Sequence, residues 1–120
     1  MKTDQVEKPI LEELKGREIS AVTFVRDYLQ LQFDGPFINF FVWPQVLQGR
    51  TMFDFNRLGY RDVLCELIGK TVGGVIERRE EKLQLFLTDG SLVEVSLLLK
   101  DRRGPEAVLF QNGKGGFGVW

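Results

Sequence analysis

The stretch LEELKGR at residues 11–17 returns as LCELIGK at residues 64–70, and this match decides the fold that the sequence predicts. Leucine, glutamate, leucine and glycine coincide, and a basic residue closes both stretches. Apolar residues lie at helical spacing in each stretch, and Gly16 and Gly69 follow at the point where a left-handed residue commonly ends a helix. The sequence therefore predicts two short helices, each stopped by a glycine.

The match continues downstream through three strands in each half of the chain. Apolar and polar residues alternate over 28–33 and over 82–87, and an Asp-Gly turn signal follows at 34–35 and at 89–90. A first strand precedes each of these segments, with a bulge signalled by the glycines at 73–74, and a third alternating strand follows each turn. We therefore predict an α+β fold of two tandem helix–three-strand repeats. A pseudo-twofold axis would relate them, and they would pack as one mostly antiparallel, barrel-like sheet system.

The length of 120 residues predicts a single domain over 1–120. Its predicted parts are repeat one at about 9–42, a connecting loop at 43–59, repeat two at about 60–97 and a C-terminal segment at 98–120. The long loop can hide one extra strand at 51–55, and the glycine-rich end is typical of a flexible terminus. Ten apolar residues are predicted to be buried: Leu11, Leu14, Leu29, Leu31, Phe33, Leu64, Leu67, Leu83, Leu85 and Leu87.

The composition excludes several classes of active site. The chain has no histidine, which rules out Ser-His-Asp triads, Cys-His pairs and histidine-containing zinc sites. The lone Cys65 cannot form an internal disulfide, and its place beside an apolar helix face predicts a buried small residue rather than a nucleophile. We assign no catalytic residue, no metal site and no cofactor.

The net charge and the N-terminus limit which partners and which cellular compartment are expected. A net charge of −1 offers no basic excess for phosphates, so no nucleic acid partner is expected. The N-terminus lacks the apolar region of a signal peptide, and no apolar run reaches membrane-spanning length. We therefore expect a cytoplasmic protein with no membrane partner.

Two charged segments are candidate ligand-binding sites. Arg61 and Asp62 lie at the opening of the second helix, where a guanidinium beside free N–H groups can hold an anion. Arg102, Arg103 and Glu106 follow the last predicted strand, where paired arginines can bind a carboxylate or phosphate. For both segments we favour a structural role as the alternative. Asp62 would complement the N-terminus of the second predicted helix, and the second segment would be a turn before a short helix with Glu106 in its first turn.

A set of aromatic residues outside the predicted repeats gives the strongest signal for a protein partner. These candidate partner-binding residues are Trp43, Phe53, Phe55, Phe117 and Trp120. Their alternative is ordinary core packing. Because burying a tryptophan offsets the ordering of a few glycines, Trp120 is predicted to pack on apolar surface of its own domain or of a neighbouring subunit.

Three segments carry a resemblance to known proteins. LGYRDVLCELIG at 58–69, FVRDYLQLQFDG at 24–35 and RGPEA at 103–107 resemble a family of small bacterial proteins with no established activity. The resemblance covers nearly the whole chain except its last residues. It implies a bacterial origin, and it carries no site over to this chain.

These observations lead to one preferred function and one alternative. The preferred hypothesis is a non-enzymatic protein-interaction or regulatory module, of the immunity type that neutralises a partner, binding another protein or itself. The alternative is a small-ligand-binding protein or enzyme that uses the Arg/Asp/Glu set in a cleft between the repeats. A nucleic-acid binder is the weakest hypothesis.

Overall fold

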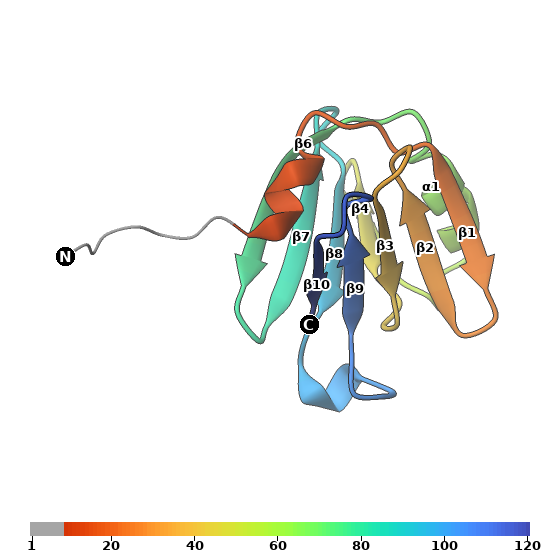
Figure 1. Cartoon of the computed structure of the whole chain (residues 1–120). Coiled ribbons are helices and arrows are strands. Elements are labelled where there is room, and N and C mark those ends of the chain that lie inside the picture. The colour runs from red at the N-terminus through yellow and green to blue at the C-terminus, as the bar shows by residue number, and fades with distance from the viewer. Residues whose placement is uncertain (1–8) are drawn as a thin grey trace.

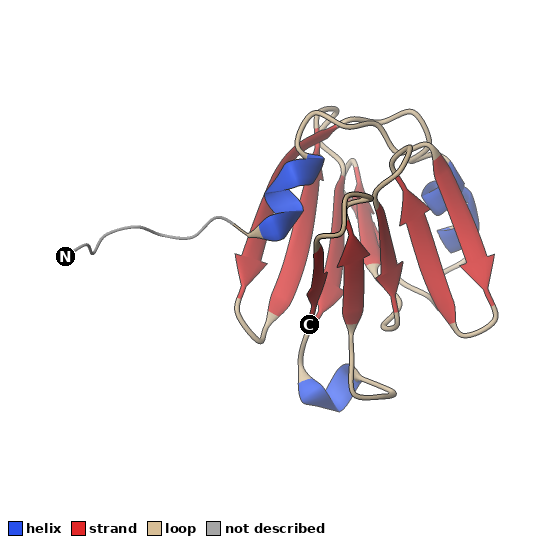
Figure 2. Cartoon of the chain, in the orientation of Figure 1, coloured by secondary structure: helices blue, strands red, loops and turns tan. Residues whose placement is uncertain are grey.

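The chain forms two antiparallel five-stranded sheets, as the computed structural model of residues 9–120 shows (Figure 1). The first sheet has the strand order β1-β2-β3-β9-β10, with β1 Ala21–Val25, β2 Tyr28–Gln32, β3 Phe37–Phe40, β9 Val108–Gln111 and β10 Phe117–Val119. The second has the order β5-β4-β8-β7-β6, with β4 Gln45–Gln48, β5 Thr51–Phe53, β6 Val72–Arg78, β7 Lys82–Leu87 and β8 Leu92–Ser96. The helical elements are short (Figure 2): η1 Ile10–Leu14, α1 Tyr60–Cys65 and η2 Leu99–Asp101.

Each sheet combines strands from both halves of the chain. Strands β1, β2 and β3 form a meander, after which the chain crosses to the second sheet, where β4 pairs with β8 and β5 lies at the edge. Strands β6, β7 and β8 form a second meander, and the chain then crosses back so that β9 pairs with β3. Neither sheet is complete without a hairpin from the other half.

The inner faces of the two sheets share one hydrophobic core. Leu29 and Leu31 of β2 and Leu83 and Leu85 of β7 point into this core, because alternate residues of a strand face the same way. All ten residues predicted to be buried are at most 4 % exposed, so that prediction is confirmed.

The segments that precede β1 and β6 fasten the two sheets together. The Gly16 N–H donates to the Val72 carbonyl at 2.8 Å, and the Val72 N–H donates to the Arg17 carbonyl at 2.9 Å. The Gly69 N–H likewise donates to the Ile19 carbonyl at 2.8 Å. Both glycines have positive φ, near +90°, which a residue without a Cβ adopts at no steric cost.

The predicted fold class is wrong: the protein is mostly β, not α+β with two tandem helix–three-strand repeats. Of the two predicted helices, only the second is an α-helix, of six residues, and the first is a 3-10 helix of five residues. The prediction also missed that the hairpins at 45–53 and 108–119 each cross to the other sheet. The strands therefore form two separate sheets with their own edges, rather than one barrel-like system.

Several local predictions can be compared with the structure. The bulge is confirmed, since the register of β6 and β7 shifts between Val72 and Gly74. The predicted loop at 43–59 carries two strands instead of one, and no helix begins at Pro105. The glycine-rich end contains β10 rather than a loose tail, and Cys65 is exposed rather than buried. The last two differences arise because the C-terminal hairpin extends the first sheet, while α1 turns its cysteine away from the core.

Candidate functional site

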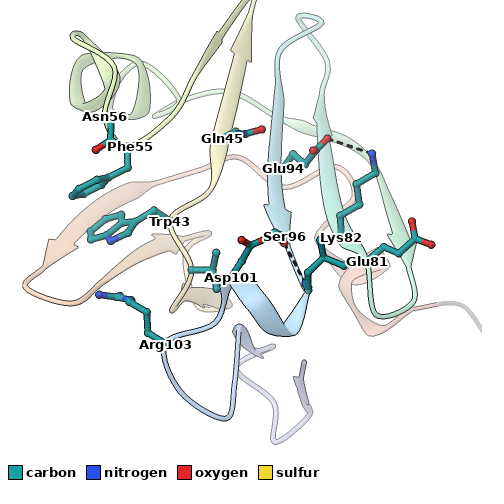
Figure 3. A pocket seen from close by; sticks show the side chains of 12 residues that line it. Trp43, Gln45, Phe55, Asn56, Glu81, Lys82, Glu94, Ser96, Asp101 and Arg103 are labelled. Atoms are coloured by element: carbon teal, nitrogen blue, oxygen red, sulfur yellow. Dashed lines mark hydrogen bonds and ion pairs between the residues drawn. The ribbon is translucent and has the colours of Figure 1, made fainter.

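A cleft of about 780 Å³ lies on the outer face of the second sheet (Figure 3). Its floor consists of Gln45 on β4, Glu94 and Ser96 on β8, and Lys82 on β7. The register of the sheet places Gln45 opposite Glu94, and Ser96 opposite Lys82. These side chains point away from the core because their neighbours along each strand point into it.

Aromatic side chains form one wall of the cleft. The ring centroids of Trp43 and Phe55 are 4.8 Å apart with the rings tilted by 33°, and Tyr60 of α1 meets Phe55 edge-on at 6.1 Å. The Tyr60 hydroxyl donates to the carbonyl of Pro44, the residue after Trp43. The wall is thus anchored to the helix, while Phe55, which lines the cleft, is 41 % exposed.

The tyrosine behind this wall stays protonated at neutral pH. Burial raises the pKa of Tyr60 above its ordinary value of 10.0, and the nearby Asp54 carboxylate raises the pKa further. The neutral phenol therefore persists as a hydrogen-bond donor to the Pro44 carbonyl. It positions the wall and does not face the cleft as an acid or base.

The charged groups of the cleft are largely paired with each other or with the backbone. Lys82 Nζ lies 3.8 Å from Glu94 Oε1, the same oxygen that accepts a hydrogen bond from Gln84 Nε2 at 2.8 Å. The Ser96 hydroxyl donates to Asp101 Oδ2 at 2.5 Å, across from Arg103 (Figure 3). The cleft therefore carries neither a cluster of bare carboxylates nor a cluster of bare cations.

The structure does not bring the predicted ligand-binding residues into one site. Arg61 and Asp62 line a separate hollow at the start of α1, where the Arg61 guanidinium lies 5.8 Å from the centroid of the Phe55 ring. Arg102 donates to the carbonyls of Leu97 and Pro105 at 3.0–3.2 Å, so its guanidinium holds the backbone after β8.

Arg103 and Glu106 lie together, beside the cleft. Both line a smaller hollow of about 350 Å³, and Arg103 also borders the main cleft. Arg103 Nη2 donates to the carbonyls of Asp27 and Phe41, which ties the last loop to the first sheet. Among the predicted ligand-binding residues, Arg103 alone reaches the main cleft, and the cleft lies on an outer sheet face rather than between two repeats.

The predicted partner-binding aromatics fall into two groups. Trp43 and Phe55 line the cleft, whereas Phe53 lies opposite the buried Val46 and packs, half-buried, against the core. Phe117 and Trp120 lie on and after β10, in the other sheet. Trp120 packs against the core of its own domain, which confirms that prediction, while Phe117 is 64 % exposed.

The outer face of the first sheet carries an apolar patch at β10. The patch, called the β10 patch, consists of Phe117 and Val119 with Leu109 and Phe37, which occupy the same face of the neighbouring strands. The side chains beside it are amides: Gln30 and Asn39 hydrogen-bond to each other at 2.9 Å across β2 and β3. An uncharged surface with an apolar centre thus borders an edge strand.

Sequence reasoning missed Gln45, Lys82, Glu94 and Ser96, the residues of the cleft floor. The alternation of β7 and β8 places Lys82, Glu94 and Ser96 on the outward face, and this is the signal that the sequence contains. The four residues come from three strands whose adjacency depends on the crossing of β4 to the second sheet. No local pattern reports that crossing.

Comparisons with known proteins complete the description of the site. Within residues 9–120, none of the helices has the length and apolar character that crossing a lipid bilayer requires. The resemblance to small bacterial proteins stays a prediction. Searches against protein-family models, curated proteins and solved structures find no match for this chain, so proposals about its function rest on the geometry described above.

Proposed function

We propose that the protein is a non-enzymatic interaction module that binds an extended segment of a partner protein along the free edge of β10. The observation that carries this proposal is that β10, an edge strand with no further strand beside it among residues 9–120, has exposed apolar side chains and no charged residue of its own. We extend the proposal to a regulatory, immunity-like role in a bacterial cytoplasm, which the resemblance and the single cysteine favour.

The backbone of β10 offers hydrogen-bonding groups to a further strand. Trp120 and Val108 exchange N–H···O bonds, and the Asn112 N–H donates to the Gly116 carbonyl, so the even-numbered residues of this segment pair with β9. In an antiparallel ladder the residues between such pairs turn their N–H and C=O groups the other way. Phe117 and Val119 therefore present these groups at the free edge.

The side chains of the β10 patch suit an apolar, extended partner. Phe117 is 64 % and Val119 43 % exposed, and neither has a charged neighbour on the adjacent strand positions Leu109 and Gln111. Natural sheet edges are usually protected by lysine, proline, a bulge or a covering helix. The three residues of β10 include no lysine, proline or bulge, and η1 packs against the core side of β10 through Ile10. Strand addition would supply main-chain hydrogen bonds, and alternate apolar side chains would cover Phe117 and Val119.

A segment of another protein fits this edge better than a second copy of the chain. A stable dimer buries about 800 Å² on each partner. A twofold contact between two β10 strands would pair only three residues on each side, from Phe117 to Val119. An added peptide strand needs only such a short edge, because it gains from backbone pairing and two apolar contacts together.

The test uses a displayed library of short linear peptides, selected on the intact protein. Val119→Pro removes an N–H that points to the free edge and leaves the pairing with β9 intact, a position where an edge strand tolerates proline. Phe117→Ala removes the exposed ring. Leu58→Ser is the matched control, since Leu58 is 97 % exposed and lies outside the β10 patch.

The expected result is a set of peptides with alternating apolar residues whose affinity falls about tenfold or more in both β10 variants, a loss of about 1.4 kcal/mol. Their binding should slow hydrogen exchange at the Phe117 and Val119 amides, and Leu58→Ser should bind as the wild type does. If no peptide is enriched, or if binding survives Val119→Pro without protection of these amides, strand addition at β10 is refuted.

A further inference from the structure

We propose that the cleft on the outer face of the second sheet binds a neutral saccharide. This site lies on the other sheet from β10, so the proposal goes beyond the protein interaction and can be tested independently of it. Its volume of about 780 Å³ falls within the range of about 300–1,000 Å³ that small-ligand sites occupy. The argument rests on the kinds of hydrogen-bonding groups that surround this space.

Donors and acceptors alternate around the cleft. Gln45 and Asn56 carry amides that both donate and accept, Asp101 brings a carboxylate, and Arg103 brings a guanidinium. A hydroxyl group donates one hydrogen bond and can accept two. A ligand with several hydroxyls can therefore form hydrogen bonds with the donors and with the acceptors of this cleft. A cation would use only the carboxylates, and an anion only the guanidinium and Lys82.

The charges of the cleft also disfavour an ionic ligand. Three carboxylates and two cations line it, and Lys82 and Glu94 already pair at 3.8 Å. The guanidinium of Arg103 lies on the Trp43 side of the cleft in Figure 3, where it would repel a cation approaching that ring. The Asp101 carboxylate opposes an anion in the same way. What remains is a site for a ligand without net charge.

The aromatic wall supplies the apolar contact that a sugar ring needs. The C–H groups of a pyranose face are weakly positive, and the face of an aromatic ring is negative. Phe55 is 41 % exposed and is held by Trp43 at 4.8 Å, by Tyr60 at 6.1 Å and by the Arg61 guanidinium at 5.8 Å, so the uncovered part of the ring is a fixed surface rather than a mobile one. An aromatic wall beside a floor of amides and carboxylates therefore matches both surfaces of a saccharide.

The experiment measures binding of a panel of soluble oligosaccharides to the intact protein by calorimetry and by fluorescence. The neutral members are oligomers of glucose, xylose, mannose, galactose and N-acetylglucosamine. Oligogalacturonate, glucosamine oligomers and adenosine represent acidic, cationic and nucleoside ligands. Trp43 and Trp120 are the two tryptophans of the chain, so a Trp120→Phe background assigns the fluorescence change to Trp43 in the cleft wall.

We expect at least one neutral oligosaccharide to bind with an affinity that does not change with salt, because no ion pair is screened. Phe55→Ala should weaken this binding about tenfold. Gln45→Ala changes an exposed position of the cleft floor and should weaken binding as well, and it serves as the test variant if Phe55→Ala does not fold. Phe117→Ala, a matched loss of an exposed phenylalanine on the other sheet, should leave it unchanged. The proposal is overturned if no neutral oligosaccharide binds, if a charged ligand or adenosine binds in preference, or if Phe117→Ala weakens binding as much as Phe55→Ala.

Discussion

Replacing Gly118 with alanine tests whether the C-terminal residues are an integral part of the fold. Gly118 is the central residue of β10 and faces the core side of the sheet. A Cβ atom at this position would lie 2.7 Å from Cη2 of Trp120 and 2.9 Å from Cγ2 of Ile10. Carbon atoms in contact are normally about 3.5–4.0 Å apart. The Trp120 ring or η1 must therefore move to admit a single methyl group.

The magnitude follows from two opposing effects. Overpacking a filled position costs about 1–3 kcal/mol, and loss of the backbone freedom of glycine in the unfolded chain returns about 0.4–1 kcal/mol. The free energy of unfolding should therefore fall by about 1–2 kcal/mol, with the Trp120 ring pushed toward water. A tail that merely rests on the surface would instead show a small gain, because the ring could move away at no cost.

The assay is urea unfolding followed by circular dichroism, analysed by linear extrapolation so that a change in midpoint can be separated from a change in slope. Gly74→Ala is the matched control, since Gly74 also lies in an edge strand but an added Cβ there meets no atom within 4 Å. The control should be as stable as the wild type or slightly more stable. Equal stability of Gly118→Ala and the wild type would refute the packing of Trp120 over β10.

Three further perturbations address the core and the two groups with shifted pKa values. Leu85→Ala removes a core side chain that is 3 % exposed and should lower the free energy of unfolding by about 2–5 kcal/mol in urea titrations, whereas a loss below about 1 kcal/mol would mean that the strand face is assigned wrongly. Hydrogen bonds from Ser91, and then from Lys70, lower the pKa of Asp89 below its ordinary value of 3.8. The stability that Asp89 contributes is therefore present above pH 3.8 and lost on further acidification, and Asp89→Asn should show a shallower loss of melting temperature over that range. Because the pKa of Tyr60 is raised above 10.0 in the folded protein, the tyrosine ionises first in the unfolded chain, and the free energy of unfolding should fall as pH rises past 10. Tyr60→Phe should reduce this fall. At neutral pH the variant should cost about 1–3 kcal/mol, because the Pro44 carbonyl loses its hydrogen-bond donor.

The parts of the fold that the sequence predicts are those that local patterns specify. The alternation of apolar residues over β2 and β7, and the Asp-Gly turns after them, carry the strand faces and the core residues. Strand β3 pairs with β9, with Phe40 opposite Val108. The residues around each of these positions give no information on which strand will lie beside it. The same is true of β4 and β8, which is why the two sheets could not be predicted as they are.

The candidate sites divide in the same way. Aromatic residues outside the predicted repeats are visible in a sequence, which predicts Phe55 and Phe117 as partner-binding candidates with core packing as the alternative. Arginines are visible too, but the sequence does not show whether a guanidinium is available to a ligand. That of Arg102 is not, because it donates three hydrogen bonds to backbone carbonyls. Only tertiary structure shows which is the case, because the acceptors are carbonyl groups that every residue carries.

The reciprocal crossing of the two hairpins has a consequence for how the chain folds. Loop-closure entropy must be overcome before β3 meets β9 or β4 meets β8, and topologies dominated by such distant pairings fold over milliseconds to seconds. Neither half can settle first as an independent nucleus, since each lacks a neighbour for its third meander strand. At high concentration during refolding, the same hairpins can find that neighbour in another molecule, so we expect intertwined dimers, formed by mutual exchange of halves, to be the characteristic misassembled product.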